Sequence, residues 1–461
     1  MSVRLFGLGW QLPLMLLWVA ESTAALAACR LAWLWVELPP VDAQTAWIQA
    51  GVFGFCVVLV MVAMGLFSRR QRDRTAGIVL RITVSVLAGG LIAALALVWF
   101  ERFSFTFKFL LVAEGVAWAL LVLVRTVARG LINQDIFKQR ILVVGAGVNA
   151  AHILHLRKRE DRRGFKVIGF VPIPGEPVKV REDRLLKANC TLAALAIEHE
   201  VDEIVVAMDE RRQQFPLKEL LECRLAGFTI SEPITFLERE TGKVHLNMLS
   251  PSWMIFGGGF RRDGFRKITE RGFDLIASLV LLILSAPFMI LVALAIKIED
   301  GLRAPIIYSQ ARVGQGGRVF PVRKFRSMGV DAEKDGQARW ASANDSRVTR
   351  VGSVIRKVRL DELPQLYNVL RGDMSFVGPR PERPEFVQHL GQSVPFYDER
   401  HSVKPGITGW AQLCYPYGAS DEDAIEKLQY DLYYVKHHSL AFDLLILLQT
   451  AEVILFGKGA R

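Results

Sequence analysis

The chain has 461 residues, of which 51% are hydrophobic, and it carries a formal net charge of +11. This length allows two or three domains, and the hydrophobic content excludes a largely disordered chain and favours membrane segments. Such a basic chain can bind nucleic acid, anionic lipid or a phosphorylated substrate. Because aromatic residues do not alternate with the basic ones, we expect no nucleic acid as partner. The five cysteines show no CxxC spacing, which argues against a zinc site and a disulfide framework.

Four long apolar runs occupy the first part of the chain, and each is close to the ~20 residues that cross a bilayer. The runs cover residues 12–35, 47–67, 78–100 and 107–132. A cleaved signal peptide explains the first run less well, because the run is long and three more follow it. The sequence therefore predicts a four-helix transmembrane domain over residues 1–134.

Basic residues indicate how these runs are oriented. Four arginines lie between the second and third runs, and further basic residues follow the fourth: Arg69, Arg70, Arg72 and Arg74, then Arg125, Arg129, Lys138 and Arg140. The positive-inside rule places both segments, and the N-terminus, in the cytoplasm. Charges within the runs (Glu21, Arg30, Arg81) are costly in lipid, so we expect them near span ends or against other helices. A functional contact of Glu21 is the alternative.

An apolar strand pattern at Ile141–Val144 opens the middle of the chain and leads into a GxGxxA turn at residues 145–150. Further strand patterns at Lys166–Val171 and Glu203–Ala207 alternate with helical ones at 191–199 and 217–226. This alternation predicts a Rossmann-like α/β domain with a parallel sheet, over residues 135–255.

Gly145 and Gly147 are candidate cofactor-binding residues, because glycines in such a turn let the backbone approach a phosphate. However, the acidic residue expected after the second strand is replaced by the sequence Phe170-Val171-Pro172-Ile173-Pro174. The Tyr-x-x-x-Lys pair of sugar-nucleotide dehydratases and epimerases is also missing from the sequence. A structural or regulatory role is therefore favoured over dinucleotide binding.

A fifth apolar run, Phe273–Ile296, has basic residues on both flanks, including Arg271 and Lys297. A full crossing would leave one basic flank outside, against the positive-inside rule. Pro287 removes a backbone hydrogen bond near the middle of the run, and Ser285 can satisfy a freed carbonyl. We therefore predict a re-entrant helix over 273–296 that bends at Ser285–Pro287 and returns to the same face. A straight fifth span is the alternative.

Two adjacent carboxylates, Asp361 and Glu362, lie in a strongly basic stretch. Alone, Asp361 reads as the N-cap of a helix that begins at Glu362, with Pro364 in its first turn. A helix N-terminus with converging cations makes an anion site, and a carboxylate there can hold a divalent metal on phosphate or attack phosphorus. The basic residues that we expect to contact phosphate or nucleotide are Lys324, Arg326 and Arg380, followed by Arg312, Arg356 and Arg359.

From about Arg271 to its end, the chain resembles the catalytic domain of the bacterial sugar transferases, the monotopic phosphoglycosyl transferases. The motifs that carry the resemblance are R-x-F-D at 271–274, Y-x-Q-x-R-x-G at 308–314, K-F-R-S-M at 324–328, D-E-L-P-Q at 361–365, V-G-P-R-P at 377–381, P-G-I-T-G at 405–409, Y-D-x-Y-Y at 430–434 and Asp443. Two positions depart from the family pattern. Glu270 replaces the usual lysine before Arg271, and Ala286 separates Ser285 from Pro287.

The apolar runs and the α/β segment resemble the large members of this family, which start exopolysaccharide chains. The opening Arg4-Leu5-Phe6-Gly7 resembles a subgroup associated with exopolysaccharide and PEP-CTERM systems. The resemblance implies an α-rich monotopic catalytic domain over residues 256–461, on the cytoplasmic face of the bacterial inner membrane. We expect the apolar run at 440–456 to lie along the interface or in the core, because acidic residues interrupt it.

The resemblance also implies an activity: transfer of a sugar 1-phosphate from a UDP-sugar to undecaprenyl phosphate, with release of UMP. Asp361 matches the nucleophile and would form a phosphoglycosyl-aspartate, while Glu362 would hold Mg²⁺. Membrane lipids, a second copy of the chain and polysaccharide assembly proteins are further expected partners. The alternatives are a non-catalytic membrane scaffold that senses a nucleotide through residues 145–151, and an oxidoreductase or epimerase on sugar nucleotides.

Overall fold

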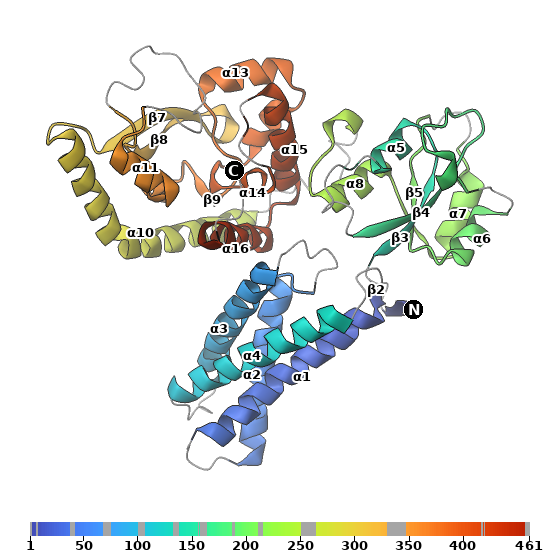
Figure 1. The fold of residues 1–461 in the computed structure, drawn as a ribbon, viewed down its shortest axis with the longest axis horizontal. Coiled ribbons are helices and arrows are strands. Elements are labelled where there is room, and N and C mark those ends of the chain that lie inside the picture. The colour runs from blue at the N-terminus through green and yellow to red at the C-terminus, as the bar shows by residue number, and fades with distance from the viewer. Residues whose placement is uncertain are drawn as a thin grey trace. The chain divides into compact units, whose positions relative to one another are not determined.

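The computed structural model of the chain (Figure 1) describes residues 2–5, 8–36, 42–67, 75–99, 107–131, 138–154, 156, 164–186, 190–210, 215–249, 264–329, 347–415, 418 and 420–456. The chain divides into two compact units, Met1–Thr241 and Gly242–Arg461. The predicted domain boundaries at 134 and 255 lie outside the described residues, as do the arginines at 69–74 that indicated orientation. The three-domain division and the orientation therefore stay predictions.

Four long helices form where the first apolar runs predict them: α1 (Leu12–Trp35), α2 (Ala43–Ala63), α3 (Thr75–Trp99) and α4 (Phe107–Leu131). A short antiparallel hairpin of β1 (Ser2–Leu5) and β2 (Leu8–Gln11) precedes them. Each helix is long and apolar enough to cross a membrane. Their outer surfaces keep large apolar side chains exposed, among them Leu34, Phe55 and Leu95. Such surfaces suit lipid, so these helices agree with the expectation of a membrane protein.

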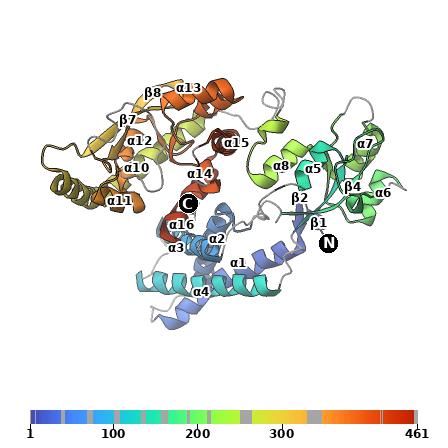
Figure 2. The same cartoon turned by 45° about the horizontal axis from the view of Figure 1, so that its top comes forward.

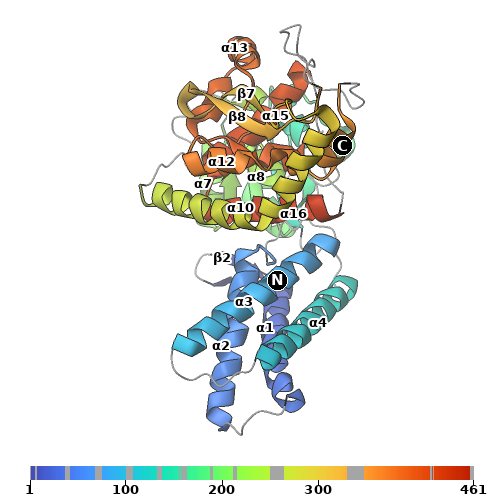
Figure 3. The ribbon, with the colours of Figure 1, turned by 90° about the vertical axis from the view of Figure 1, so that its left-hand side faces the viewer.

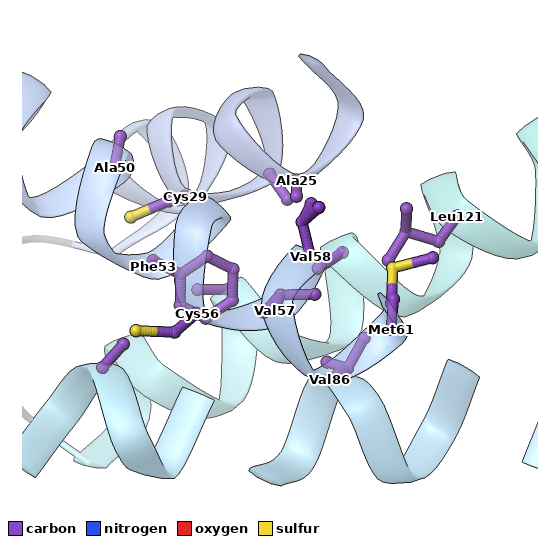
Figure 4. Close-up of a cluster of buried hydrophobic side chains, with 14 of the residues drawn as sticks. Ala25, Cys29, Ala50, Phe53, Cys56, Val57, Val58, Met61, Val86 and Leu121 are labelled. Atoms are coloured by element: carbon purple, nitrogen blue, oxygen red, sulfur yellow. The ribbon is translucent and has the colours of Figure 1, made fainter. Parts of the chain in front are cut away.

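Small side chains let the four helices approach closely. Ala25, Ala28, Cys29 and Ala32 recur at helical spacing along α1, and all are fully buried. They pack with Phe53 and its neighbours on α2, and the same cluster includes side chains of α3 and α4 (Figure 4). At Gly89 of α3 an added Cβ would lie 2.6 Å from Cα of Val57, so the two backbones need glycine there.

The charges within these helices face other helices, as expected. Glu21 of α1 is fully buried, and its two carboxylate oxygens lie 2.6 and 2.7 Å from Nε and Nη2 of Arg125 on α4. Arg125 also donates to the carbonyl of Leu66, and Arg81 donates to that of Met64, just after α2. The arginines thus satisfy carbonyls that the end of α2 leaves without helical partners.

The predicted parallel sheet is present in the first unit, with the strand order β4-β3-β5-β6. Its strands are β3 (Gln139–Val144), β4 (Phe165–Val171), β5 (Glu203–Val206) and β6 (Thr229–Ser231). Its helices are α5 (Val148–Leu154), α6 (Leu192–Glu198), α7 (Leu217–Leu225) and α8 (Pro233–Thr241), with a 3₁₀ turn, η2, at Glu182–Arg184. Helices α6 and α7 cover one face of the sheet, while α5 and α8 lie on the other (Figures 1 and 2).

The second unit is mainly helical around two small strand pairs. β7 (Ile307–Val313) and β8 (Val319–Phe325) form an antiparallel hairpin, while β9 (Ser375–Val377) and β10 (Gly406–Thr408) pair in parallel. The helices are α10 (Gly264–Asp300), α11 (Arg350–Lys357), α12 (Gln365–Arg371), α13 (Pro384–Ser393), α14 (Trp410–Cys414), α15 (Asp421–His437) and α16 (Leu440–Phe456). Four 3₁₀ turns complete it: η3 (Leu246–Met248), η4 (Gln315–Gly317), η5 (Leu360–Glu362) and η6 (Tyr397–Ser402).

The core of the second unit gathers side chains from β8, α12, β9, α14, α15 and α16. Tyr430 and Tyr434 of α15 are buried in it, together with Trp410 and Ile446. The sequence left two roles open for these tyrosines, lining the acceptor or nucleotide site and packing in the core, and both side chains are buried in the core. Since Ile446 and the buried Asp443 belong to α16, that helix packs against the unit.

Helix α10 is 37 residues long, contains Pro287 and is visibly bent (Figures 1 and 3). A proline inside a helix removes a hydrogen bond and clashes with the preceding turn, which accounts for a kink. Ser285 donates to Sδ of Met289, at 3.6 Å. Most of the apolar side chains of α10 are exposed, among them Ile276, Leu284 and Leu291. A smaller share of α10 is buried than of α1, α2, α3 or α4.

Candidate active site

The carboxylate pair lies between two helices of the second unit. Helix α11, capped by Thr349, ends at Lys357, and Arg359 then adopts the left-handed conformation with φ 61° and ψ 17°. This sharp turn starts the 3₁₀ turn η5, which carries Asp361 and Glu362. Helix α12 begins only at Gln365, with Pro364 at its N-cap position and no side-chain cap bond. The reading of Asp361 as the cap of a helix starting at Glu362 is therefore wrong.

Asp361 is buried, with 8% of its surface exposed, and its Oδ1 has no hydrogen-bond partner among the described residues. Burial raises the pKa of this carboxyl group, and the neighbouring charge of Glu362 raises it further. Lys324, Arg356 and Arg359 act in the opposite direction but do not outweigh burial. A desolvated carboxylate of raised pKa is a stronger nucleophile than an ordinary aspartate in water.

Glu362 is in the opposite electrostatic state. Its Oε1 lies 2.9 Å from Nζ of Lys324, 3.4 Å from Nη2 of Arg380 and 4.0 Å from Nη1 of Arg359. Burial alone would raise the pKa of Glu362, but Lys324 and Arg380 outweigh it and hold the pKa at about 2. The pKa of Asp361 is therefore raised while that of its neighbour Glu362 is lowered. Such a difference lets two carboxyl groups take separate roles.

The six predicted phosphate-contacting residues divide into two groups. Lys324, Arg359 and Arg380 meet at Glu362, and Arg356 acts on Asp361 through its charge. The other two, Arg312 and Arg326, have protein partners of their own.

Arg326 is buried and pairs with Asp300, at 2.5 Å, which ties β8 to the end of α10. Arg312 donates to the carbonyl of Pro381 at 3.2 Å and lies 3.5 Å from a carboxylate oxygen of Glu382. We therefore see Arg326 as holding α10 in place and Arg312 as holding the loop that carries Arg380.

Sequence reasoning assigned no role to several buried polar residues that hold this framework. Asp274 of α10 is fully buried and accepts hydrogen bonds from Oγ of Ser375 and the backbone N–H of Phe376. Arg271 donates to two carbonyls at the end of α12, and Arg400 and Asp431 form a buried ion pair. In the sequence, such a residue can be found as a charged side chain within an otherwise apolar pattern, such as Asp274 next to Phe273.

The glycine turn of the α/β sheet has its backbone donors occupied by the chain's own carboxylates. Asp209 accepts from the N–H groups of Val148 and Asn149, both at 2.8 Å. Glu176 accepts from the N–H of Ala146 at 2.9 Å and from that of Asp209 at 2.8 Å. These are the groups that would cradle a phosphate in a dinucleotide-binding turn. Cofactor binding at Gly145 and Gly147 stays a prediction, and a bound phosphate would have to displace both carboxylates.

The carboxylate pair fits a magnesium ion by the chemistry of its donors. Within the described residues, no three His, Cys, Asp or Glu side chains gather into a metal cluster. However, Mg²⁺ is commonly held by one or two carboxylates together with water and substrate phosphate. Asp361 Oδ1 lacks a partner in the described structure, and the three cations near Glu362 all approach Oε1. An oxygen on each carboxylate is thus placed to take a metal or a phosphorus.

Comparison with known proteins identifies the group to which the second unit belongs. The family model described as bacterial sugar transferase matches residues 265–457, which include the carboxylate pair and its cations. The chain is 32% identical over 361 residues to the UDP-glucose:undecaprenyl-phosphate glucose-1-phosphate transferase of Xanthomonas campestris pv. campestris, covering 74% of this chain and 72% of that protein.

Two further relatives differ in the sugar that their names carry. One is the UDP-N-acetylgalactosamine-undecaprenyl-phosphate N-acetylgalactosaminephosphotransferase of Aeromonas hydrophila, 42% identical over 242 residues. That match covers 52% of this chain and little more than half (56%) of that protein. The other is the undecaprenyl-phosphate galactose phosphotransferase of Salmonella typhimurium, 29% identical over 383 residues and covering 79% of both chains. The chain belongs to the bacterial sugar transferase family.

Proposed function

We propose that this protein transfers a sugar 1-phosphate from a UDP-sugar to undecaprenyl phosphate and releases UMP. The observation that carries the proposal is the state of the carboxylate pair. Asp361 is buried, with one oxygen that has no hydrogen-bond partner in the part of the chain that the structure describes, and Glu362 beside it is held ionised by Lys324 and Arg380. The names of the Aeromonas and Xanthomonas relatives carry both a UDP-sugar and undecaprenyl phosphate, which supports the same substrates here.

In the first step, a carboxylate oxygen of Asp361 attacks the β-phosphorus of the UDP-sugar. The bond from that phosphorus to the bridging oxygen breaks, UMP leaves with the electron pair, and the sugar phosphate remains bound to Asp361. Asp361 attacks as the carboxylate, so no base has to take a proton from it, and its burial limits the access of water that would hydrolyse the intermediate. Lys324 and Arg380 are placed to stabilise charge on the transferred phosphate.

In the second step, a phosphate oxygen of undecaprenyl phosphate attacks the same phosphorus. The bond to Asp361 breaks, the carboxylate is regenerated, and the product is a diphosphate that joins the sugar to the lipid. Each step exchanges one anhydride bond of the transferred phosphorus for another, so no oxidant, reductant or further group is needed. A split into two displacements also lets the soluble donor and the lipid acceptor use the site in turn.

Mg²⁺ is the cofactor we propose, with Glu362 as its main protein ligand and an oxygen of Asp361 within the same site. When bound, it supplies positive charge to the diphosphate and so eases departure of UMP. The three cations on Oε1 fix the orientation of Glu362, which keeps its second oxygen available.

The catalytic unit lies, in this proposal, on the cytoplasmic face of the bacterial inner membrane, with α10 as a re-entrant helix and α1–α4 as four spans. A straight 37-residue helix would be roughly 55 Å long and would separate its ends by a full bilayer. Yet Arg271 near its start donates to the carbonyl of Val369 at the end of α12, while Asp300 at its end pairs with Arg326 beside β8. Both ends are tied to one compact unit, which favours return to the same face.

Labelling with an impermeant thiol reagent in intact cells tests this topology. A cysteine at Arg318, exposed in the β7–β8 turn, should stay unlabelled until the cells are opened. A cysteine at Phe107, exposed at the start of α4 and expected outside, is the positive control, with the exposed Cys190 replaced by serine in both variants. Labelling of Arg318→Cys in intact cells contradicts the re-entrant arrangement.

Release of UMP tests the activity itself. Purified protein should release UMP from at least one of UDP-glucose, UDP-galactose and UDP-N-acetylgalactosamine, and net turnover should require undecaprenyl phosphate. With the donor alone, release of about one UMP per enzyme indicates the covalent sugar phosphate. Donor hydrolysis at the same rate with and without the lipid acceptor would contradict the proposal.

We further propose that the product starts an exopolysaccharide chain, with assembly proteins and a second copy of the chain as partners.

A non-catalytic scaffold that senses a nucleotide through the glycine turn is the second candidate. The self-occupied N–H groups of that turn count against it. Absence of UMP release with all three donors, together with nucleotide binding to the α/β domain, would favour it.

A further inference from the structure

The loop that carries Arg380 has few backbone donors of its own. It runs from Gly378 to Glu382, and two of its five residues, Pro379 and Pro381, have no backbone N–H to donate. Gly378 donates its N–H to the carbonyl of Thr408 at 2.9 Å, and the carbonyl groups of the loop accept from donors in other parts of the unit.

The structure provides one donor for each of four successive carbonyls of this loop. The pairs are Gly406 N with Pro379 O at 3.0 Å, Arg400 Nη2 with Arg380 O at 3.0 Å, Arg312 Nη1 with Pro381 O at 3.2 Å, and Val313 N with Glu382 O at 2.9 Å. Two of the donors are arginine side chains, and the other two belong to the backbones of β7 and β10. The loop is thus held by hydrogen bonds along its length. Arg400 is the donor to the carbonyl of Arg380, the residue whose side chain reaches Glu362.

Arg400 is itself fixed in a buried network. Its side chain is 6% exposed and donates through Nε and Nη2 to Oδ2 of Asp431, at 3.1 and 2.8 Å. Its Nη1 donates to the hydroxyl of Tyr397 at 2.9 Å. A guanidinium can make all these bonds at once because its donors form a rigid planar fork, whereas the single ammonium of lysine cannot reproduce that pattern.

A buried ion pair is costly to desolvate and is seldom explained by stability alone. Here the pair places one donor on the backbone of the residue whose side chain reaches Glu362. Arg380 lies 3.4 Å from Oε1 of Glu362 and helps to hold the pKa of that carboxyl group at about 2. Fixing the Arg380 backbone therefore fixes the charge next to the catalytic carboxylates.

We propose that Arg400, held by Asp431, is a positioning residue that acts on catalysis through Arg380. The proposal rests on the phosphoryl transfer proposed above, because it assigns Arg380 to the transferred phosphate. Arg312 supports the same loop from its other side, at the carbonyl of Pro381. Its part is therefore positional rather than a direct phosphate contact.

The first test is Arg400→Lys. Lysine keeps a positive charge beside Asp431 but cannot donate to Asp431, Tyr397 and the carbonyl of Arg380 at the same time. Removal of that charge is avoided because it would leave Asp431 buried and unpaired and risk unfolding. We expect kcat to fall about 10- to 100-fold, as for a displaced catalytic group. The KM for undecaprenyl phosphate should change by less than about threefold, because Arg400 is buried and its donors are used by protein groups. The matched control is Tyr397→Phe, which removes one hydrogen bond from the same guanidinium and leaves the carbonyl contact intact. It should lose less than about threefold in kcat.

The second test combines Arg400→Lys with Arg380→Gln. If Arg400 acts through Arg380, the double variant should be no slower than Arg380→Gln alone, because the side chain being positioned is already gone. If the loss of kcat in the double variant equals the product of the two single losses, Arg400 acts independently of Arg380, and the proposal is overturned.

Hydrogen–deuterium exchange gives a readout that does not depend on turnover. Peptides covering residues 378–382 should exchange faster in Arg400→Lys and at the wild-type rate in Tyr397→Phe. Unchanged exchange in Arg400→Lys would overturn the proposal. A wild-type protein that releases no UMP from any donor would refute the proposed function, while the exchange result would still decide the role of Arg400.

Discussion

Two regions of this molecule look like anion sites in the sequence, and they differ in what satisfies their polar groups. In the glycine turn of the α/β sheet, the backbone donors at 146, 148 and 149 are taken by the chain's own carboxylates, Glu176 and Asp209. At the carboxylate pair, three cations converge on Glu362 while Oδ1 of the buried Asp361 is left without a partner in the described structure.

A buried carboxylate oxygen without a partner in the described structure distinguishes the carboxylate pair from the glycine turn. A buried polar atom without a partner costs free energy, so it persists where function requires it. At the glycine turn, Asp209 and Glu176 each accept two backbone hydrogen bonds, so this turn is closed to a phosphate unless both carboxylates move. The strained backbone of Arg359 next to Asp361 points the same way, because left-handed non-glycine residues cluster at functional sites.

Removal of the Asp361 nucleophile should have the largest effect. Asp361→Asn keeps the shape of the side chain but cannot form the covalent sugar phosphate, so UMP release should fall by about 10⁴-fold or more. The thermal midpoint should stay close to that of the wild type, because the change removes a charge whose burial is unfavourable. Asp183→Asn, an exposed change in the α/β domain, is the control. Retention of a tenth of the wild-type rate would contradict the assignment.

Glu362→Gln should have the second-largest effect, on both kcat and the pH profile of the reaction. The neutral amide is a poorer ligand for Mg²⁺ and no longer holds Lys324 and Arg380 by charge, so kcat should fall by about 10²- to 10³-fold. The substitution should also shift the pH profile: the ionised Glu362 raises the pKa of Asp361, and Asp361 attacks only when ionised. Activity therefore falls as the pH drops through the pKa of Asp361, and this acid limb should move to lower pH in the variant. An acid limb that moves to higher pH would contradict the coupling.

The backbone of Arg359 offers a smaller and sharper test. Arg359→Gly removes the side chain but accepts the left-handed conformation, whereas Arg359→Ala removes the side chain and opposes that conformation by about 1–2 kcal/mol. Both variants lose a cation 4.0 Å from Glu362. We expect the glycine variant to be about 5-fold more active than the alanine variant, as measured by UMP release. Equal activities would show that only the charge of Arg359 matters.

The sequence predicted the elements well, because their signals are local. All four N-terminal helices and the parallel strands β3, β4 and β5 lie within a few residues of their predicted positions. It also named three cations that do meet at Glu362. It did not separate them from Arg326, whose partner Asp300 lies 26 residues earlier in the chain. Pairings of this kind depend on which distant segments meet, and periodicity carries no information about that.

The smallest effect on catalysis is expected from a substitution in the glycine turn. In Gly147→Ala the added Cβ would lie 2.2 Å from Oδ2 of Asp209, so the carboxylate must move and its two backbone hydrogen bonds weaken. We expect a lower thermal midpoint, corresponding to about 1–3 kcal/mol, with UMP release within about twofold of the wild type. Added NAD should not raise the midpoint of the wild-type protein, because the donors of this turn are already occupied. A Gly147→Ala protein that stays folded but loses activity would mean that the turn takes part in catalysis, and the contrast between an open and a closed site would then fail.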